Sequence, residues 1–282
     1  MQNLIDGKSK IFSKNTIICL GIIALAGFLI RLFYFPEGIP ITLDGTIYFW
    51  YANDLSVSGI FPSNLDIPNN GWPTFLSVFF SLFSAENFLE YMDLQRYITI
   101  IISVTTIIPV FILCRKFCGN ELSLLGALLF VFQPRIIENS LSGLTEPLFI
   151  LLGLSCLVLF LQKDLKFNYL SFAFLALACL ARYEGIVLII PLSVFFLLKY
   201  RGDKKIILRY FIAISIFLLV LFPMISVRMD TMGYDGIVSH SMAAGIKFGE
   251  PDHYSEAYTG PSFTAFLGII AFIKPAALAT FP

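Results

Sequence analysis

The chain has 282 residues, of which 57% are hydrophobic and 13% are charged, and its mean hydropathy is +0.83. Soluble domains carry about 25% charged residues and about 45–50% apolar residues, so this composition excludes a water-facing globular surface and indicates a membrane protein. The 19 basic and 19 acidic residues give a net charge of zero, which leaves no excess of Lys and Arg for a nucleic-acid partner.

Long apolar runs predict an all-α, polytopic membrane protein with about eight spans, because a helix needs about 20 apolar residues to cross the hydrocarbon. The first run is longer than the apolar core of about 7–15 residues that a cleaved signal peptide has, so we expect a retained anchor. The predicted spans cover residues 16–35, 94–114, 121–137, 146–162, 167–183, 184–199, 206–227 and 262–280.

The distribution of Lys and Arg predicts the topology, because cytoplasmic loops carry an excess of these residues. Most of the basic residues gather in four clusters at the ends of the predicted spans. We expect all four on the cytoplasmic side, together with the N-terminus. The clusters are Lys8, Lys10 and Lys14; Arg115 and Lys116; Lys163 and Lys166; and Lys199, Arg201, Lys204, Lys205 and Arg209.

This topology makes residues 36–93 a first outer loop, which is acidic, rich in aromatic residues and without a basic residue. Its apolar run at 72–83 is too short to cross the membrane, so we expect a re-entrant or interfacial helix. A second helix is predicted to begin at Asp44 and to lie along the membrane surface. One of its faces would carry Ile47, Trp50, Tyr51 and Leu55.

Charged residues at the outer ends of separate spans are candidates for function, because charge near the apolar zone is costly. A mixture of carboxylates and guanidinium groups suits a substrate that bears phosphate: Arg binds the phosphate, and a carboxylate takes a proton or a metal ion. The residues expected at this level are Asp44, Arg135, Glu138, Glu146, Arg182 and Glu184.

Structural roles remain open for these residues. Asp44 is as well suited to capping its helix, and Glu146 to capping a helix that begins with Pro147. Arg182 and Glu184 would also fit a simple ion pair, or side chains that extend to the lipid headgroups.

Other polar residues are more typical of structural positions. Arg31 and Arg135 are typical of interfacial anchors, and His240 and His253 lie 13 residues apart in a polar loop that is a poor metal site. The five cysteines indicate neither a disulfide framework nor a zinc site.

Short motifs in a fixed order carry a resemblance to a known family. They are Asp44-Gly-Thr-Ile-Tyr-Phe-Trp-Tyr-Ala-Asn-Asp-Leu, Gly71-Trp-Pro, Cys114-Arg-Lys-Phe-Cys-Gly, Gln133-Pro-Arg, Leu144-Thr-Glu-Pro-Leu and Leu180-Ala-Arg-Tyr-Glu-Gly. Over residues 16–227 the chain resembles the GT-C superfamily of integral-membrane glycosyltransferases. Within it, the closest likeness is to the protein O-mannosyltransferase-like and aminoarabinose-transferase-like branch, glycosyltransferase family 39.

The resemblance implies transfer of a sugar from a polyprenyl-phosphate-linked donor to a hydroxyl group at the outer or lumenal face, with inversion. Asp44 then matches the family's first-loop acid, a general base, and Glu146 matches its second-loop acid. Arg182 matches an arginine near the donor phosphate, and Glu184, Arg135 and Tyr48 are expected to bind substrate. The acceptor class, whether protein, lipid or glycan, stays open.

Two departures from the family pattern leave a divalent metal ion open as a cofactor. Many relatives have an acidic pair where this chain has Asp44 followed by Gly45, and some have Asp at position 146. Family members usually continue through further spans, so a chain ending at Pro282 fits a fragment or a minimal member.

The predicted organisation is a catalytic membrane module over 1–227, an outer loop over 228–261 and a last span within 262–282. The membrane would be the cell membrane, or the endoplasmic reticulum in a eukaryote. Two other functions remain: a transporter of lipid or solute, and a non-catalytic scaffold or truncated homologue. Transporters commonly have repeated halves and mid-membrane ionisable groups, whereas here the charges gather at one face.

Overall fold

The structure is a computed structural model that describes residues 13–41, 44–63, 65, 67 and 69–239. The described residues up to Ile237 belong to one compact unit. Throughout the described part of this unit the regular structure is helical, which confirms the predicted all-α class.

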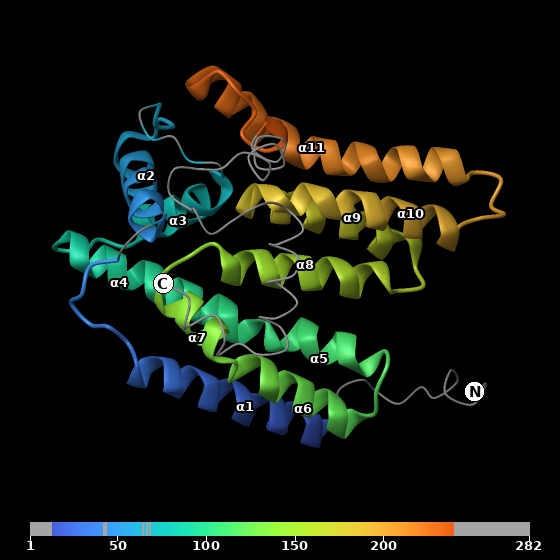
Figure 1. The fold of residues 1–282 in the computed structure, drawn as a ribbon, viewed down its shortest axis with the longest axis horizontal. Helices are drawn as coiled ribbons and strands as arrows, with labels where there is room; N and C mark the ends of the chain where they lie inside the picture. Colours follow the sequence, from blue (N-terminus) through green and yellow to red (C-terminus); the bar gives the residue numbers. More distant parts are fainter. Residues whose placement is uncertain (1–12, 42–43, 64, 66, 68, 240–282) are drawn as a thin grey trace, which may run out of the picture. The chain divides into compact units, whose positions relative to one another are not determined.

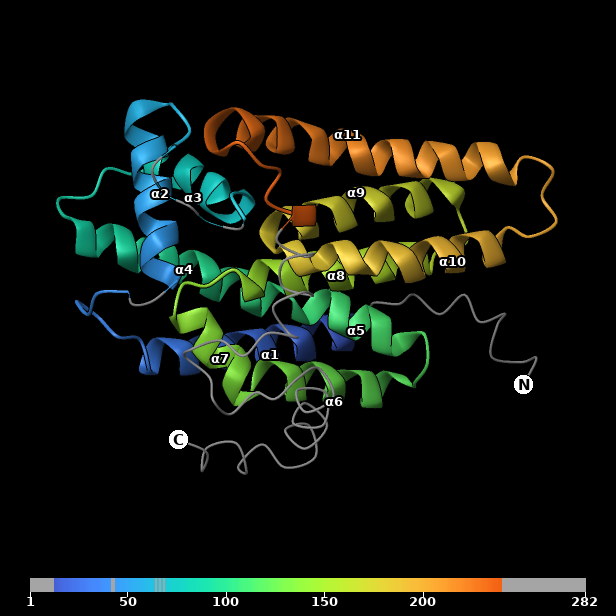
Figure 2. The same cartoon turned by 45° about the horizontal axis from the view of Figure 1, so that its top comes forward.

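Eleven α-helices and one 3₁₀ helix, η2, follow one another in the described residues. Most of them run side by side, whereas α2 crosses the others at one end of the bundle (Figures 1 and 2). Their bounds are α1 Lys14–Phe33, α2 Asp44–Ser58, α3 Gly71–Leu82, α4 Phe88–Thr105, α5 Ile107–Arg115, α6 Asn120–Val131, α7 Pro134–Leu141, α8 Glu146–Phe160, α9 Leu165–Ala181, η2 Tyr183–Leu188, α10 Ile189–Lys199 and α11 Ile206–Met232.

Three helical segments of the described residues are long and apolar enough to cross a membrane: α1, the nearly continuous pair α4 and α5, and α11. The pair α6 and α7 would make a fourth if it counts as one broken span. The helices α8 and α9 overlap predicted spans. At 15 and 17 residues they are shorter than the roughly 20 residues that a helix needs to cross the hydrocarbon. The predicted span at 262–280 lies outside the described residues, so eight spans remain a prediction.

The predicted span at 121–137 is bent rather than straight. The helix α6 ends at Val131, and α7 begins at Pro134 with its axis turned by 48°. Proline lacks the N–H that a continuing helix needs, but it is favoured at a first helical position. The side chain of Gln133 caps the new helix by accepting a hydrogen bond of 2.7 Å from the backbone N–H of Ile136. Pro134 therefore redirects the chain at this end of the bundle.

The two helices predicted in the first outer loop are present as α2 and α3. Of the apolar face predicted on α2, Ile47 and Trp50 are exposed, whereas Tyr51 is buried. The helix packs into a core rather than lying alone on a surface, and it buries Tyr48 and Phe49 as well as Tyr51. One end of the bundle thus carries a compact cap of α2 and α3.

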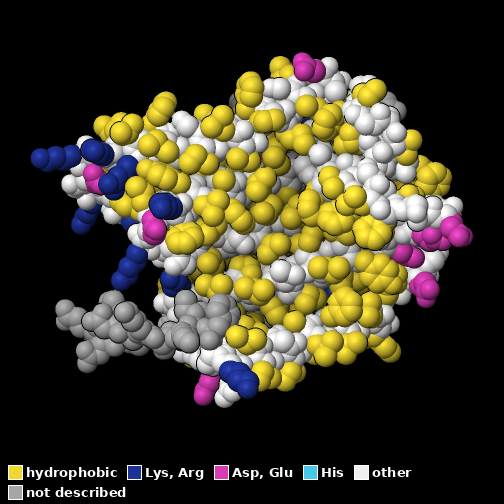
Figure 3. All heavy atoms as spheres, turned by 180° about the vertical axis from the view of Figure 1, so that it is seen from behind, with side chains coloured by type: hydrophobic (Ala, Val, Ile, Leu, Met, Phe, Trp, Pro, Cys, Tyr) yellow, Lys and Arg dark blue, Asp and Glu magenta, His cyan; other side chains and the backbone are white. Residues whose placement is uncertain are grey.

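The charged side chains of the described residues separate between the ends of the helices. Lys and Arg gather mainly at one end, and most Asp and Glu lie at the other (Figure 3). The basic end holds the α5–α6, α8–α9 and α10–α11 connections, where the predicted cytoplasmic clusters lie. The acidic end holds the cap of α2 and α3.

Arg31 is not the interfacial anchor that the sequence predicted. Its side chain is fully buried and donates hydrogen bonds to two carbonyl oxygens, those of Gly27 at 2.8 Å and Val131 at 3.1 Å. It also donates to the hydroxyls of Ser103 and Ser140, both at 3.0 Å. Arg31 therefore ties α1 to α4, α6 and α7 inside the bundle.

Candidate active site

Three connections meet at the acidic end of the bundle and position the candidate residues. Asp44 is the first residue of α2, Glu146 is the first residue of α8, and Arg182 directly follows α9. The cap approaches α9 closely, because a Cβ atom at Gly71 of α3 would lie only 2.5 Å from the carbonyl oxygen of Leu180. Only glycine permits this contact, which brings the start of α3 close to the arginine.

Arg182 lies between two glutamates. Its Nη1 donates to Glu146 Oε1 at 2.6 Å and to Thr145 Oγ1 at 3.3 Å. Its other edge pairs with both carboxylate oxygens of Glu184: Nη2 to Oε1 at 2.8 Å, and Nε to Oε2 at 3.4 Å. All three nitrogens are engaged, which fixes the plane of the guanidinium.

The ion-pair partners differ in exposure. The side chains of Arg182 and Glu146 are each 29% exposed, and that of Glu184 is 44% exposed. Burial lowers the pKa of Arg182, but the hydrogen bond to Glu184 and the charge of Glu146 outweigh it and raise this pKa above its ordinary value. Arg182 is therefore a permanent cation, and the more exposed carboxylate, Glu184, is the partner that a bound anion can replace most readily.

Tyr48 connects this ion-pair group to Asp44. The phenol is 8% exposed, and burial together with the charge of Asp44 raises its pKa to about 12. The carboxylates of Glu146 and Glu184 act in the same direction, while Arg182 opposes them. A phenol with this pKa stays protonated at physiological pH and can donate a hydrogen bond to a substrate oxygen.

The structure brings together five of the seven predicted site residues: Asp44, Tyr48, Glu146, Arg182 and Glu184. Arg135 and Glu138 are exposed on α7 and make none of these contacts. The ion pair between Arg182 and Glu184, which the sequence left open as an alternative, is present in the structure. The carboxylate of Glu146 binds Arg182 instead of capping α8, which has no side-chain cap.

An apolar cavity of about 320 Å³ begins at Phe149, one turn of α8 beyond Glu146. It is lined along one face of α8 from Phe149 to Phe160, by Leu175 of α9, and along η2 and α10 from Leu188 to Phe195. Gly185, which follows Glu184, packs against one of the lining residues, since a Cβ atom there would lie 3.2 Å from the ring of Phe149. The apolar lining is suited to a hydrocarbon chain.

Sequence reasoning missed two residues that shape the site. Thr145 is buried, and its hydroxyl accepts one of the two hydrogen bonds that Arg182 Nη1 donates. Gln95 of α4 is fully buried, and its side-chain amide reaches the segments on which Asp44 and Glu146 lie. The available signal was the position of Gln95 at the start of an apolar span, where a polar side chain is costly unless it has a partner.

A divalent metal ion does not fit the described residues of this site. No group of three or more His, Cys, Asp or Glu side chains in the described part of the chain could hold a metal ion. The Arg182 guanidinium lies where a cation shared by Glu146 and Glu184 would lie. The reaction proposed below therefore has no step at a metal ion. The two histidines, His240 and His253, lie outside the described residues.

Comparison with known proteins places this geometry in a family. The model of the dolichyl-phosphate-mannose-protein mannosyltransferase family matches residues 73–227, more than half of the chain. The chain belongs to this family. Its membership confirms the resemblance to the GT-C glycosyltransferases, and with the apolar helices it makes the chain an integral membrane protein. The search of curated proteins found no match.

The fold of this mannosyltransferase-family member is similar to a solved structure, that of the Archaeoglobus fulgidus oligosaccharyltransferase in the apo form. The TM-score is 0.63 at 15% identity, over 95% of this chain and 38% of that one. The chain therefore spans about 38% of the length of the oligosaccharyltransferase. Glu146 and Arg182 lie inside the residues that match the family model, whereas Asp44 and Tyr48 precede them.

Proposed function

We propose that the chain transfers a sugar from a polyprenyl-phosphate-linked donor to an acceptor hydroxyl at the outer or lumenal face of the membrane. The observation that carries this proposal is the apolar cavity that begins at Phe149, one turn of α8 from Glu146, the ion-pair partner of Arg182. An isoprenoid chain in the cavity would place the donor phosphate at the guanidinium. The two ends of the site then match the two ends of one amphiphilic donor.

Arg182 is the proposed phosphate-binding residue. A planar guanidinium pairs with phosphate oxygens through two parallel hydrogen bonds. The edge formed by Nε and Nη2 now holds the exposed Glu184 and would pass to the phosphate, while Nη1 keeps its bond of 2.6 Å to Glu146. Glu146 would thus hold Arg182 in place as negative charge grows on the departing phosphate.

Asp44 is the proposed general base. The acceptor oxygen attacks the anomeric carbon, the bond from that carbon to the phosphate oxygen breaks, and the phosphate leaves with the electron pair. The acceptor's proton passes to the Asp44 carboxylate, which is exposed at the start of α2. Tyr48 donates a hydrogen bond to the sugar or phosphate. Attack opposite the leaving group inverts the anomeric configuration.

The proposed orientation follows from the charge at the two ends of the helices. The basic connections would face the cytoplasm, where positive charge accumulates. The acidic end with Asp44 and Arg182 would then face the outside or the lumen, with the N-terminus in the cytoplasm.

The decisive experiment measures sugar transfer by the full chain in lipid nanodiscs that contain polyprenyl-phosphate-linked mannose. Replacing Asp44→Asn removes the base but keeps the shape, so kcat should fall by about 10²- to 10⁴-fold while donor binding persists. Asp54→Asn is the matched control, because Asp54 lies on the same helix three turns away.

Equal turnover of the Asp44→Asn protein and the wild type would remove Asp44 as the base. Donor binding without any transfer by the wild type would favour the non-catalytic scaffold. Failure to bind the donor would reject the proposed donor class.

A further inference from the structure

Gln95 lies between the two segments that carry the acidic residues of the site. Its Nε2 donates to the carbonyl oxygen of Gly143 at 2.8 Å and to that of Gly45 at 3.2 Å. Gly45 directly follows Asp44, and Gly143 precedes Glu146 by three residues. One side-chain amide thus joins the start of α2 to the segment that leads into α8.

The orientation of this amide is determined by its surroundings. Gln95 is fully buried, and both acceptors of its NH₂ group are carbonyl oxygens. Rotating the amide by half a turn would set its own oxygen against two other oxygens, which repel it. The amide therefore has one favourable orientation, in which both N–H bonds bridge the two segments.

The backbone around Gln95 is packed too closely for larger residues. A Cβ atom at Gly45 would lie 2.9 Å from the carbonyl oxygen of Ser142 and would collide with Ile41. Gly143 has φ of +66°, and a Cβ atom there would lie 3.0 Å from Gln95 Nε2. Only glycine suits both positions, which lets the two segments approach until one amide can bridge them.

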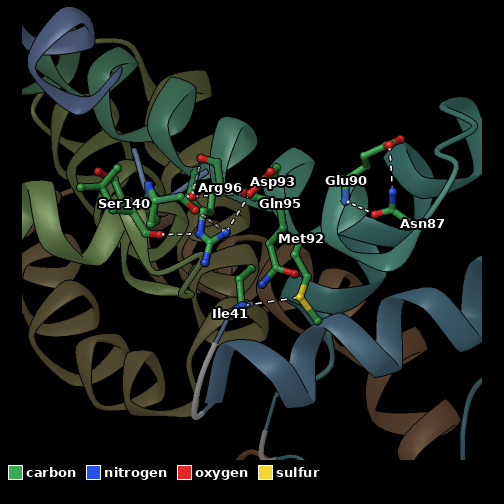
Figure 4. Close-up of polar contacts among 11 residues, drawn as sticks. Ile41, Asn87, Glu90, Met92, Asp93, Gln95, Arg96 and Ser140 are labelled. Carbon is green, nitrogen blue, oxygen red and sulfur yellow. Dashed lines mark hydrogen bonds and ion pairs between the residues drawn. The ribbon is translucent and has the colours of Figure 1, made fainter. Parts of the chain in front are cut away.

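Other bonds from α4 hold one of these segments without reaching the other. Thr99 Oγ1 donates to the carbonyl oxygen of Ser140 at 2.6 Å, and Arg96 Nε donates to that of Leu141 at 3.1 Å. Figure 4 shows Arg96 directed to the side of Ser140 and Asp93, whereas Gln95 and Met92 are directed toward Ile41 and the start of α2. Of Gln95, Arg96 and Thr99, Gln95 alone bonds to both Gly45 and Gly143.

We propose that Gln95 is a positioning residue, which fixes the separation of Asp44 from Glu146 and, through Glu146, from Arg182. This inference rests on the proposed function, since the general base and the phosphate-binding arginine belong to different segments. A displacement of about 1 Å between reacting groups can cost on the order of 10²-fold in rate. The carbonyl bridge keeps the proton acceptor and the leaving-group site in register before substrate binds.

The test compares Gln95→Met with Thr99→Val in the full chain in nanodiscs. Methionine keeps the length and flexibility of glutamine but loses both hydrogen bonds. Thr99→Val removes a buried bond one turn away that does not reach Gly45. We expect kcat of Gln95→Met to fall by about 10- to 100-fold while the donor KM changes less than about threefold, as expected when only transition-state geometry is lost.

A second readout does not require activity. Amide hydrogen exchange of the peptides containing Gly45 and Gly143 should rise in both segments in Gln95→Met, and in the Gly143 segment only in Thr99→Val. The variant Gln95→Glu, protonated at low pH, can donate to one carbonyl. Relative to the wild type at the same pH, it should therefore recover part of the activity at low pH and lose it as the pH rises.

The possible outcomes test the positioning role of Gln95 separately from the proposed sugar transfer. Unchanged exchange at both segments would overturn the bridge, whatever the activity. Raised exchange with unchanged kcat would overturn the positioning role. Raised exchange together with a wild-type protein that binds donor but transfers no sugar would reject the proposed function and leave the bridge standing.

Discussion

Two arginines, Arg31 and Arg182, occupy contrasting environments in the bundle. Arg31 is fully buried, and the four acceptors that it bonds are neutral carbonyl and hydroxyl oxygens. Arg182 lies at the acidic end, is 29% exposed and pairs with two carboxylates. Both carry the same charge, so the partners and the exposure set their roles.

The contrast shows what makes a cation available to substrate. The acceptors of Arg31 belong to α1, α4, α6 and α7, so releasing the guanidinium would disrupt helix packing. Glu184 is exposed and only two residues from Arg182, and an exposed ion pair is worth about 0.2–1 kcal/mol. The proposed donor phosphate would replace Glu184 at small cost, whereas the acceptors of Arg31 are part of the helix packing.

Replacing Arg31→Leu should have the largest effect on stability. The substitution leaves the carbonyl oxygen of Val131 and the hydroxyls of Ser103 and Ser140 without their donor. The free energy of unfolding should fall by about 2–4 kcal/mol, measured by thermal unfolding in detergent. Arg135→Leu, at an exposed position of α7, is the control and should stay near the wild type. Equal melting temperatures for both variants would contradict the structural role of Arg31.

Replacing Arg182→Ala should reduce activity strongly and stability only slightly, the reverse of Arg31→Leu. The donor kcat/KM should fall on the order of 10²-fold, the cost of losing one preorganised donor to developing negative charge. The free energy of unfolding should change by less than about 1 kcal/mol, because the ion pairs are partly exposed. Arg182→Lys keeps the charge without the planar fork and should lie between. A donor kcat/KM equal to that of the wild type would remove Arg182 from the phosphate site.

The smallest expected effect is a shift in the pKa of Tyr48, which reports on the charges around Arg182. The folded protein holds this phenol proton up to a pKa of about 12, while the unfolded chain releases it at the ordinary pKa of 10.0. Stability from Tyr48 is therefore complete below pH 10 and declines as the pH rises through this window. Tyrosinate absorbance of the wild type minus that of Tyr48→Phe isolates the group.

Two variants should move the Tyr48 pKa in opposite directions. Glu184→Gln removes a negative charge and should lower it, whereas Arg182→Ala removes a positive charge and should raise it. Shifts of the same sign in both variants would show that Tyr48 does not sense the ion-pair group.

Local patterns in the sequence were sufficient for the helices and for the charged residues at their acidic ends. A basic cluster marks one end of each pair of spans, and Asp44, Glu146 and Arg182 each begin or follow a helix at the other end. The apolar faces were harder to predict, as Tyr51 illustrates. Periodicity places a side chain on a face, but it does not say whether another helix covers that face.

The sequence by itself determined the membrane environment, the helical class and the order of the charged motifs, because these depend on local composition and spacing. Only the tertiary structure decided that Arg31 is an internal tie, that Arg135 lies apart from the ion-pair group, and that Gln95 bridges the segments of Asp44 and Glu146. The hydrogen bonds of Gln95, and that of Arg31 to Ser140, join residues more than 40 positions apart in the chain. Such contacts follow from the packing of whole helices, which local spacing does not encode.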